Sequence, residues 1–172
     1  MLFALYRITS AEIHPGTNMT EGFYKTDTFK TSNDDTWTTP RDFYDKLNDE
    51  FHFGLDAAAL QASTLVPNNW YGPDHPEVTR KDAFKRLWHL DSLNKPIWLN
   101  PPYGRTIRDW MKKANAESMS GGVVVCLVPA RTDTNWWHDY CIQYEVRFIR
   151  GRLKFGNQKN SAPFPSAVVV MR

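Results

Sequence analysis

Large apolar residues recur at helical spacing in the first patterned segment of the chain, directly after a Thr-Pro pair. The spacing predicts a helix over about residues 41–50, with Thr39 as its N-cap and Pro40 at its first position. One face of this helix carries Phe43, Leu47 and Phe51. The first 33 residues show no clear period, so we expect a partly disordered N-terminal arm at 1–33 and a single domain at 34–172.

Strand-like and helix-like segments alternate along the rest of the chain. Short alternating or continuous apolar runs predict strands at 51–56, 96–100, 122–130, 145–155 and 166–172. A short strand or turn is expected near Trp70. Helical spacing predicts helices over 78–90, 105–118 and 134–144, the last with Asp133 or Thr134 as its cap. The run at 122–130 is apolar throughout, which is typical of a central strand buried on both faces.

This alternation predicts an α/β fold with right-handed crossovers and a mostly parallel sheet. Only a loop separates the last two strands, which predicts an antiparallel pair at the C-terminal edge of the sheet. In such a sheet, ligands bind at the carboxyl ends of the strands. Three polar corners are expected there, namely Asp56, Asn100–Tyr103 and Pro129–Arg131.

Composition narrows the class of protein. The chain has 172 residues, of which 41% are hydrophobic and 23% charged, a balance typical of globular proteins. No apolar run approaches the roughly 20 residues that a membrane helix needs. The five histidines have no HxH or HxxxH spacing, and Cys126 and Cys141 form no ligand pair. We therefore expect no metal site, and reduced cysteines in a cytosolic protein.

The distribution of charge is more informative than its sum. The net charge is only +2, which gives no general argument for nucleic-acid binding. Basic residues nevertheless gather in two segments, around residues 80–86 and 147–159. Aromatic residues make up 14% of the chain, and aromatic side chains near basic ones suit unstacked bases. A tryptophan-rich core with solvated charges would have the same composition.

The sequence Asn100-Pro101-Pro102-Tyr103 predicts a stiff polar corner. Each proline fixes its own φ and holds the preceding residue extended, so the Asn100 side-chain oxygen and the Pro101 carbonyl are preorganised acceptors. Two acceptors beside an aromatic ring suit a planar group that bears an NH₂. Accepting both of its hydrogens localises the nitrogen lone pair for attack. Stacking on Tyr103 would contribute roughly 1–3 kcal/mol. An ordinary turn with a packed tyrosine is the alternative interpretation.

Several segments, taken in order, resemble the small phage-type DNA N6-adenine methyltransferases. These enzymes use S-adenosylmethionine (SAM) and have a Rossmann-like methyltransferase fold. The resemblance covers about residues 35–171 and rests on WTTP (37–40), LDAAA (55–59), LNPPYG (99–104), VPARTDTNWW (128–137), RGRLKF (150–155) and APFPSA (162–167). The chain departs from many methyltransferases in one respect, because LDAAA stands where they have a glycine-rich loop.

The resemblance implies a role for each matching residue. The catalytic loop is Asn100, Pro101, Pro102 and Tyr103. Binding of SAM is implied for Trp37, Thr38, Thr39, Pro40, Asp56, Ala57 and again Asn100. Contact with DNA is implied for Arg105, Arg131, Asp133, Arg152, Lys154 and Phe155. Structural roles are the alternative: Asp56 as a helix cap, Trp37 and Phe155 as core residues, and Arg131 and Arg152 as solvated charges.

The activity expected from this resemblance is site-specific methyl transfer from SAM to a flipped adenine of DNA. Recognition of the target would come from short insertions, for which the candidates are 71–90, 104–110, 131–138 and 154–165. Three other amines fit the same corner: RNA adenine, cytosine N4 and a protein glutamine. A non-catalytic nucleic-acid-binding module is a further alternative. We expect a phage or prophage protein in the bacterial cytoplasm, a monomer or weak homodimer on a palindromic site, with Met1 or Met19 as its start.

Overall fold

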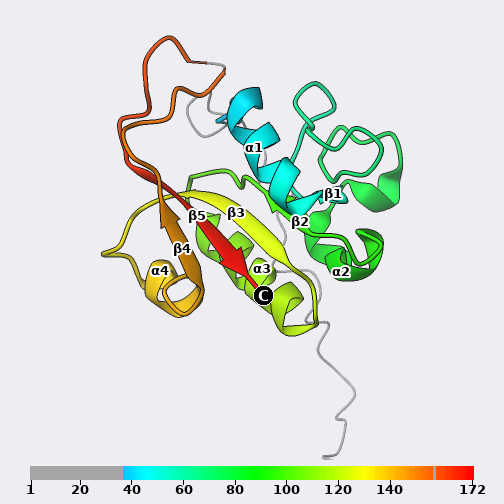
Figure 1. Cartoon of the computed structure of the whole chain (residues 1–172). Coiled ribbons are helices and arrows are strands. Elements are labelled where there is room, and N and C mark those ends of the chain that lie inside the picture. Colours follow the sequence, from blue (N-terminus) through cyan, green and yellow to red (C-terminus); the bar gives the residue numbers. More distant parts are fainter. Residues whose placement is uncertain (1–36, 157) are drawn as a thin grey trace, which may run out of the picture. The chain divides into compact units, whose positions relative to one another are not determined.

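A mixed sheet is the centre of the computed structural model, which describes residues 37–156 and 158–172 (Figure 1). Within these residues the sheet has five strands in the order β1-β2-β3-β5-β4. The strands are β1 (Leu55–Asp56), β2 (Ile97–Leu99), β3 (Val124–Pro129), β4 (Glu145–Phe148) and β5 (Ser166–Met171). The arm expected at 1–33 lies outside the described residues.

Strand direction divides the sheet into two halves. Strands β1, β2 and β3 run parallel, whereas β5 is antiparallel to both of its neighbours, β3 and β4. The parallel beginning and the antiparallel C-terminal pair agree with the prediction, and β4 forms the edge. Every residue of β3 and β5 is buried, as expected for valine-rich runs in the middle of a sheet.

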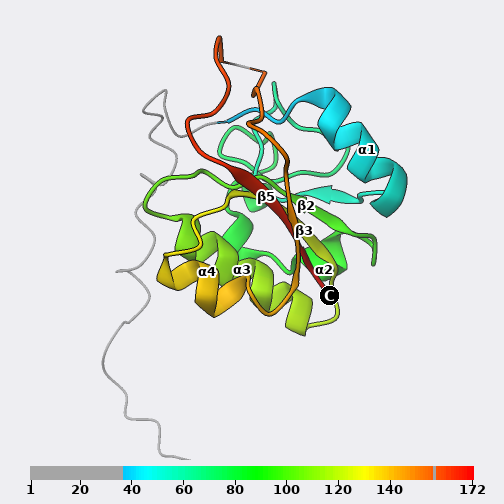
Figure 2. The same ribbon diagram turned by 60° about the vertical axis from the view of Figure 1, so that its left-hand side comes forward.

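Helices cover both faces of the sheet. Helix α1 (Arg41–Phe51) lies on one face, while α2 (Trp88–Asp91), α3 (Ile107–Met119) and α4 (Asn135–Tyr140) lie on the other (Figures 1 and 2). The side chain of Trp98 in β2 points toward α1, where its ring packs against Tyr44 and Phe53 at centroid distances of 5.5 and 5.4 Å. Because side chains alternate along a strand, Asn100 follows on the same face as Trp98.

Several predicted elements differ from those observed. The strand expected at 51–56 is reduced to Leu55–Asp56, because helix α1 continues to Phe51. The helix expected at 78–90 is broken into the 3₁₀ turns η2 (Val78–Arg80) and η3 (Ala83–Lys85) and the short α2. The break occurs where the Asp82 carboxylate accepts a hydrogen bond from the Phe84 N–H, which starts a new turn. The strand expected at 145–155 ends at Phe148, since Gly151 takes a left-handed backbone with φ of 84°.

The start of α1 also corrects the prediction. The N-cap of the helix is Pro40, with an extended backbone, and its carbonyl accepts hydrogen bonds from the N–H groups of Phe43 and Tyr44. Thr39 is therefore one residue too early to cap the helix, and its hydroxyl is used elsewhere. At α4, Thr134 does occupy the N-cap position, but its hydroxyl donates to the Arg131 carbonyl rather than capping.

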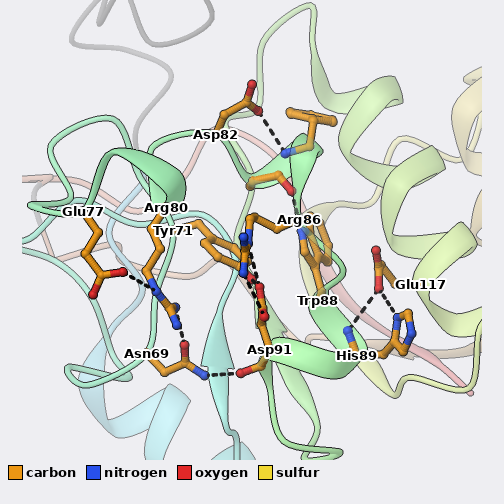
Figure 3. A network of polar contacts seen from close by, with 12 residues as sticks. Asn69, Tyr71, Glu77, Arg80, Asp82, Arg86, Trp88, His89, Asp91 and Glu117 are labelled. Carbon is orange, nitrogen blue, oxygen red and sulfur yellow. Dashed lines mark hydrogen bonds and ion pairs between the residues drawn. The ribbon is translucent and has the colours of Figure 1, made fainter.

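Polar contacts hold the segment between β1 and β2 in place (Figure 3). The Asn69 side-chain NH₂ donates to the carbonyls of Gly54 and Asp91, at 2.7 Å each. The Asn69 oxygen accepts a hydrogen bond of 2.6 Å from Arg80. Because Gly54 immediately precedes β1, this arrangement fixes a strand that is only two residues long and that ends in Asp56.

Two carboxylates anchor α2 (Figure 3). Asp91, its last residue, accepts hydrogen bonds from the Tyr71 hydroxyl and, at 2.8 Å, from Arg86 Nε. Glu117 of α3 is 3% exposed and accepts a hydrogen bond of 3.1 Å from the backbone N–H of His89. Its Oε2 also lies 2.7 Å from His89 Nδ1. These contacts join α2 to α3 and to the segment that follows β1.

Candidate active site

Three corners meet at one edge of the sheet, as predicted. Strand β1 ends at Asp56 and β2 is followed by Asn100, and the parallel register sets Asp56 beside Trp98. In β3, Cys126 is level with Leu99, so Pro129 ends that strand slightly beyond Asn100. This is the edge where open α/β sheets bind their ligands.

The side chain of Asn100 is held by a segment from the far N-terminal side of the fold. We call residues Trp37–Pro40 the N-terminal strap. The Asn100 Nδ2 donates to the Trp37 carbonyl at 2.5 Å and to the Thr39 hydroxyl at 3.0 Å. Both hydrogens of the amide are therefore used, and the amide oxygen faces away from the strap.

Tyr103 occupies one side of that oxygen. Its hydroxyl lies 2.7 Å from Asn100 Oδ1 and 3.2 Å from the Leu127 carbonyl, and its single hydrogen is shared between these two acceptors, with Asn100 the nearer. The residue is only 5% exposed, and burial raises its pKa well above the ordinary tyrosine value, so the phenol is neutral. An amide oxygen has two lone pairs, and Asn100 Oδ1 therefore has capacity for one further donor.

An aromatic cluster covers the corner. It consists of Trp37, Tyr103, Phe155 and Phe164. Trp37 contacts Phe155 and Phe164 at centroid distances of 5.2 and 5.1 Å, and Tyr103 meets Phe164 nearly edge-on at 5.6 Å. Trp37 and Phe164 are half-buried, whereas Phe155 is fully buried. Tyr103 thus has phenylalanine rings beside it rather than an open face.

Asp56 is a buried carboxylate. It is 3% exposed, and its oxygens accept hydrogen bonds from the N–H groups of Leu65 at 3.0 Å and Ala58 at 3.4 Å, and from the Thr64 hydroxyl at 3.5 Å. Burial raises the pKa of Asp56 to about 6, against the lowering effect of these bonds. No helix follows Asp56, so it caps none. Within the described residues it forms no salt bridge.

The structure places the other expected site residues in two environments. The strap is tied to the loop between β4 and β5, because the Thr38 carbonyl accepts a hydrogen bond from the Gly156 N–H. Ala57 and Pro101 are buried, and Pro40 and Pro102 are half-buried. The charged residues expected to meet DNA are all exposed: Arg105, Arg131, Asp133, Arg152 and Lys154. Phe155 lies instead in the aromatic cluster.

Sequence reasoning missed two kinds of residue here. Phe164 stands in the quoted segment APFPSA, and its position between Pro163 and Pro165 was a usable signal. The Thr64 hydroxyl and the Leu65 backbone N–H donate hydrogen bonds to Asp56, and no pattern in the sequence predicts either bond.

Two other kinds of feature are absent from the described part of the chain. Residues 37–156 and 158–172 contain no group of three or more His, Cys, Asp or Glu side chains placed to hold a metal ion. None of their helices is long and apolar enough to cross a membrane.

A comparison with known protein families shows which family the chain belongs to. The family model described as DNA N-6-adenine-methyltransferase (Dam) matches residues 25–171. The chain belongs to this DNA N-6-adenine-methyltransferase family. The match covers the strap, all five strands and the corner at Asn100. The family resemblance inferred from the sequence motifs is therefore confirmed.

A curated relative of the family comes from a bacteriophage. The chain is 31% identical, over 104 residues, to the protein named DNA N-6-adenine-methyltransferase of Escherichia phage T1. The aligned region is 60% of this chain and 39% of the phage protein, so the chain spans well under half the length of that relative. No solved structure matches the chain.

Proposed function

We propose that this chain is a SAM-dependent DNA adenine-N6 methyltransferase, with a Rossmann-like domain at residues 34–172. Membership of the Dam family supports the reaction class. The observation that carries the proposal is the geometry of Asn100, whose amide is locked with its oxygen turned toward Tyr103 at the carboxyl edge of the sheet. The resemblance to the phage T1 enzyme supports DNA as substrate.

The corner at Asp56 fits the cofactor. SAM carries an α-ammonium group and hydroxyls, and when bound it supplies a methyl group on a cationic sulfur. Asp56 is a buried carboxylate whose partners in the described residues are neutral donors, so it has unmet capacity for a cation or a hydroxyl. The strap and Ala57 flank the same edge. We assign SAM binding to Trp37, Thr38, Thr39, Pro40, Asp56, Ala57 and Asn100.

Asn100 and Pro101 would prepare the adenine amine. The free lone pair of Asn100 Oδ1 and the Pro101 carbonyl accept its two hydrogens, which favours a tetrahedral nitrogen and stabilises the positive charge that develops there. An amide accepts no proton at neutral pH, so the cationic nitrogen would pass its extra proton to solvent water only after it is methylated. Tyr103 and Phe164 provide aromatic surfaces for the flipped base, which enters by displacing part of their mutual contact.

Exposed cations near the corner would hold the DNA backbone. Arg105 directly follows the catalytic loop, Arg131 follows β3, and Arg152 and Lys154 lie in the loop between β4 and β5. Phosphate contacts of this kind position the duplex without reading its sequence. We assign them, with Asp133, to DNA binding. On a palindromic target a monomer or a weak homodimer would act, in the cytoplasm of a bacterial host.

Transfer of a labelled methyl group from SAM tests this proposal. Duplex DNA should accept label, and Asn100→Ala should abolish transfer while the protein stays folded, with a thermal unfolding temperature that is lowered by the loss of three hydrogen bonds. A duplex without adenine should accept none. Transfer to that duplex, to RNA or to protein instead would support one of the other amine substrates. Failure of calorimetry to detect SAM binding would leave a non-catalytic nucleic-acid-binding module.

A further inference from the structure

The orientation of the Asn100 amide is decided by the N-terminal strap. The Trp37 carbonyl can only accept hydrogen bonds, and it lies 2.5 Å from Asn100 Nδ2. A half-turn of the amide would set Oδ1 against that carbonyl, so two oxygens would repel each other in a half-buried site. The proline-stiffened loop fixes the Asn100 backbone, but only the strap distinguishes one end of its side chain from the other.

Thr39 supplies the second acceptor. Its hydroxyl oxygen lies 3.0 Å from Asn100 Nδ2, and the residue is 6% exposed. The bond spans 61 positions of the sequence, so it forms only when the strap and β2 are both in place. Hydrogen bonds accepted from the N–H groups of an amide push electron density toward its oxygen, which makes that oxygen a stronger acceptor.

Asparagine suits this site better than aspartate, because the Trp37 carbonyl can only accept a hydrogen bond. A carboxylate at position 100 would present an oxygen to the Trp37 carbonyl, with no proton between them. The Thr39 hydroxyl could reverse and donate, but the backbone carbonyl could not. The strap therefore matches an amide, and it presents the amide oxygen to the corner that contains Tyr103.

We propose that Thr39 is a positioning residue for methyl transfer, which acts through Asn100 by holding the amide in the orientation that the Trp37 carbonyl selects and by strengthening the amide oxygen as an acceptor. This inference rests on the proposed function. It assigns Thr39 a task separate from contact with SAM, and separate from the N-cap role that the sequence predicted. Thr39→Val keeps the shape of the side chain and removes the acceptor, whereas Thr39→Ser keeps the hydroxyl and loses a methyl group.

Single-turnover methylation with saturating SAM and DNA measures the effect. At saturating SAM and DNA, we expect Thr39→Val to slow transfer at least tenfold whatever its effect on the Kd for SAM, and Thr39→Ser to stay within threefold of the wild-type rate. Ser120→Ala is the control, because the Ser120 hydroxyl donates to Ala116 at the far end of α3. It should leave the rate unchanged.

The side-chain NH₂ signals of Asn100 in ¹⁵N NMR give a readout independent of activity. Thr39→Val should shift one of the two proton signals strongly, and Thr39→Ser should not. A Thr39→Val rate within twofold of the wild type, or a loss that appears only as weaker SAM binding, would overturn the positioning role. If wild-type protein methylates no DNA, the proposed function fails, and the NMR signals still test whether Thr39 holds Asn100.

Discussion

At the scale of single residues, Asn100 and Asp56 show how two polar groups at one edge acquire different properties. Asn100 is neutral and held by three hydrogen bonds, so its orientation is what it would contribute to the proposed methyl transfer. Asp56 is a carboxylate removed from water, and burial raises its pKa to about 6. One group is therefore insensitive to pH, and the other changes charge in a range that cells approach.

The raised pKa of Asp56 leads to a prediction about SAM affinity. In the proposed SAM site only ionised Asp56 would attract the SAM ammonium, so the affinity for SAM should fall at least threefold as the pH drops from 7.5 to 5 through the pKa of about 6. Asp56→Asn should bind weakly at every pH in this range, and Asp49→Asn, an exposed site on α1, should keep the wild-type profile. Calorimetric titrations across pH measure this, and a flat wild-type profile would remove Asp56 from the cofactor site.

The raised pKa of Asp56 also makes the free energy of unfolding depend on pH. The direction is opposite to that of an ordinary ion-paired carboxylate, whose pKa is lowered by folding. Because the folded state holds the Asp56 proton more tightly than the unfolded chain, it binds more protons between about pH 4 and 6. The contribution of Asp56 to the free energy of unfolding therefore declines as pH rises through that window. The binding of a cation to Asp56 would offset this decline.

At the scale of elements, the local sequence pattern was sufficient to predict some helices and strands but not others. The predicted helix at 41–50 and the strands at 96–100, 122–130 and 166–172 were correct, because strong periodicity or continuous burial specifies them. The helix at 78–90 was wrong, since an Asp82 side chain competed successfully with the backbone. The family resemblance pointed to residues 37–40, but their hydrogen bonds with Asn100 were not predicted, because they depend on tertiary structure.

At the scale of elements, the contacts by which Glu117 joins α2 to α3 lead to a prediction about stability. Burial alone would raise its pKa, but hydrogen bonds from Lys113 and His89 hold the pKa below the ordinary glutamate value. Removing this buried carboxylate leaves two donors of α2 and α3 without their acceptor. Glu117→Leu should therefore lower the free energy of unfolding by about 2–3 kcal/mol at pH 7.

Urea denaturation at several pH values checks this. The folded pKa is lowered, so the stabilisation is present above the unfolded value of about 4.3 and is lost as pH falls toward the folded pKa. The difference between wild type and Glu117→Leu should thus shrink in acid. Glu77→Leu, at an exposed site in the same region, is the matched control and should cost little. An equal effect of the two variants would show that the buried contact does not join the helices.

At the scale of the whole molecule, the sequence predicted the sheet edge and the family, but not the covering of the site. The corners at Asp56, Asn100 and Pro129 meet because parallel strands end together. The aromatic cluster beside Asn100 joins the strap to the loop before β5, and neither segment has a period that predicts its partner. The candidate site is therefore assembled from the N-terminal strap and the loop before β5, around a corner that Pro101 and Pro102 stiffen locally.

The central claim is that this corner methylates adenine in DNA. The most direct test is to express the chain in bacteria that lack adenine methylation and to map modified bases in their genomic DNA. We expect N6-methyladenine at one short recurring sequence with the wild-type chain, and none with Asn100→Ala produced at equal level. Genomic DNA without N6-methyladenine, from cells that contain folded wild-type protein, would contradict the claim.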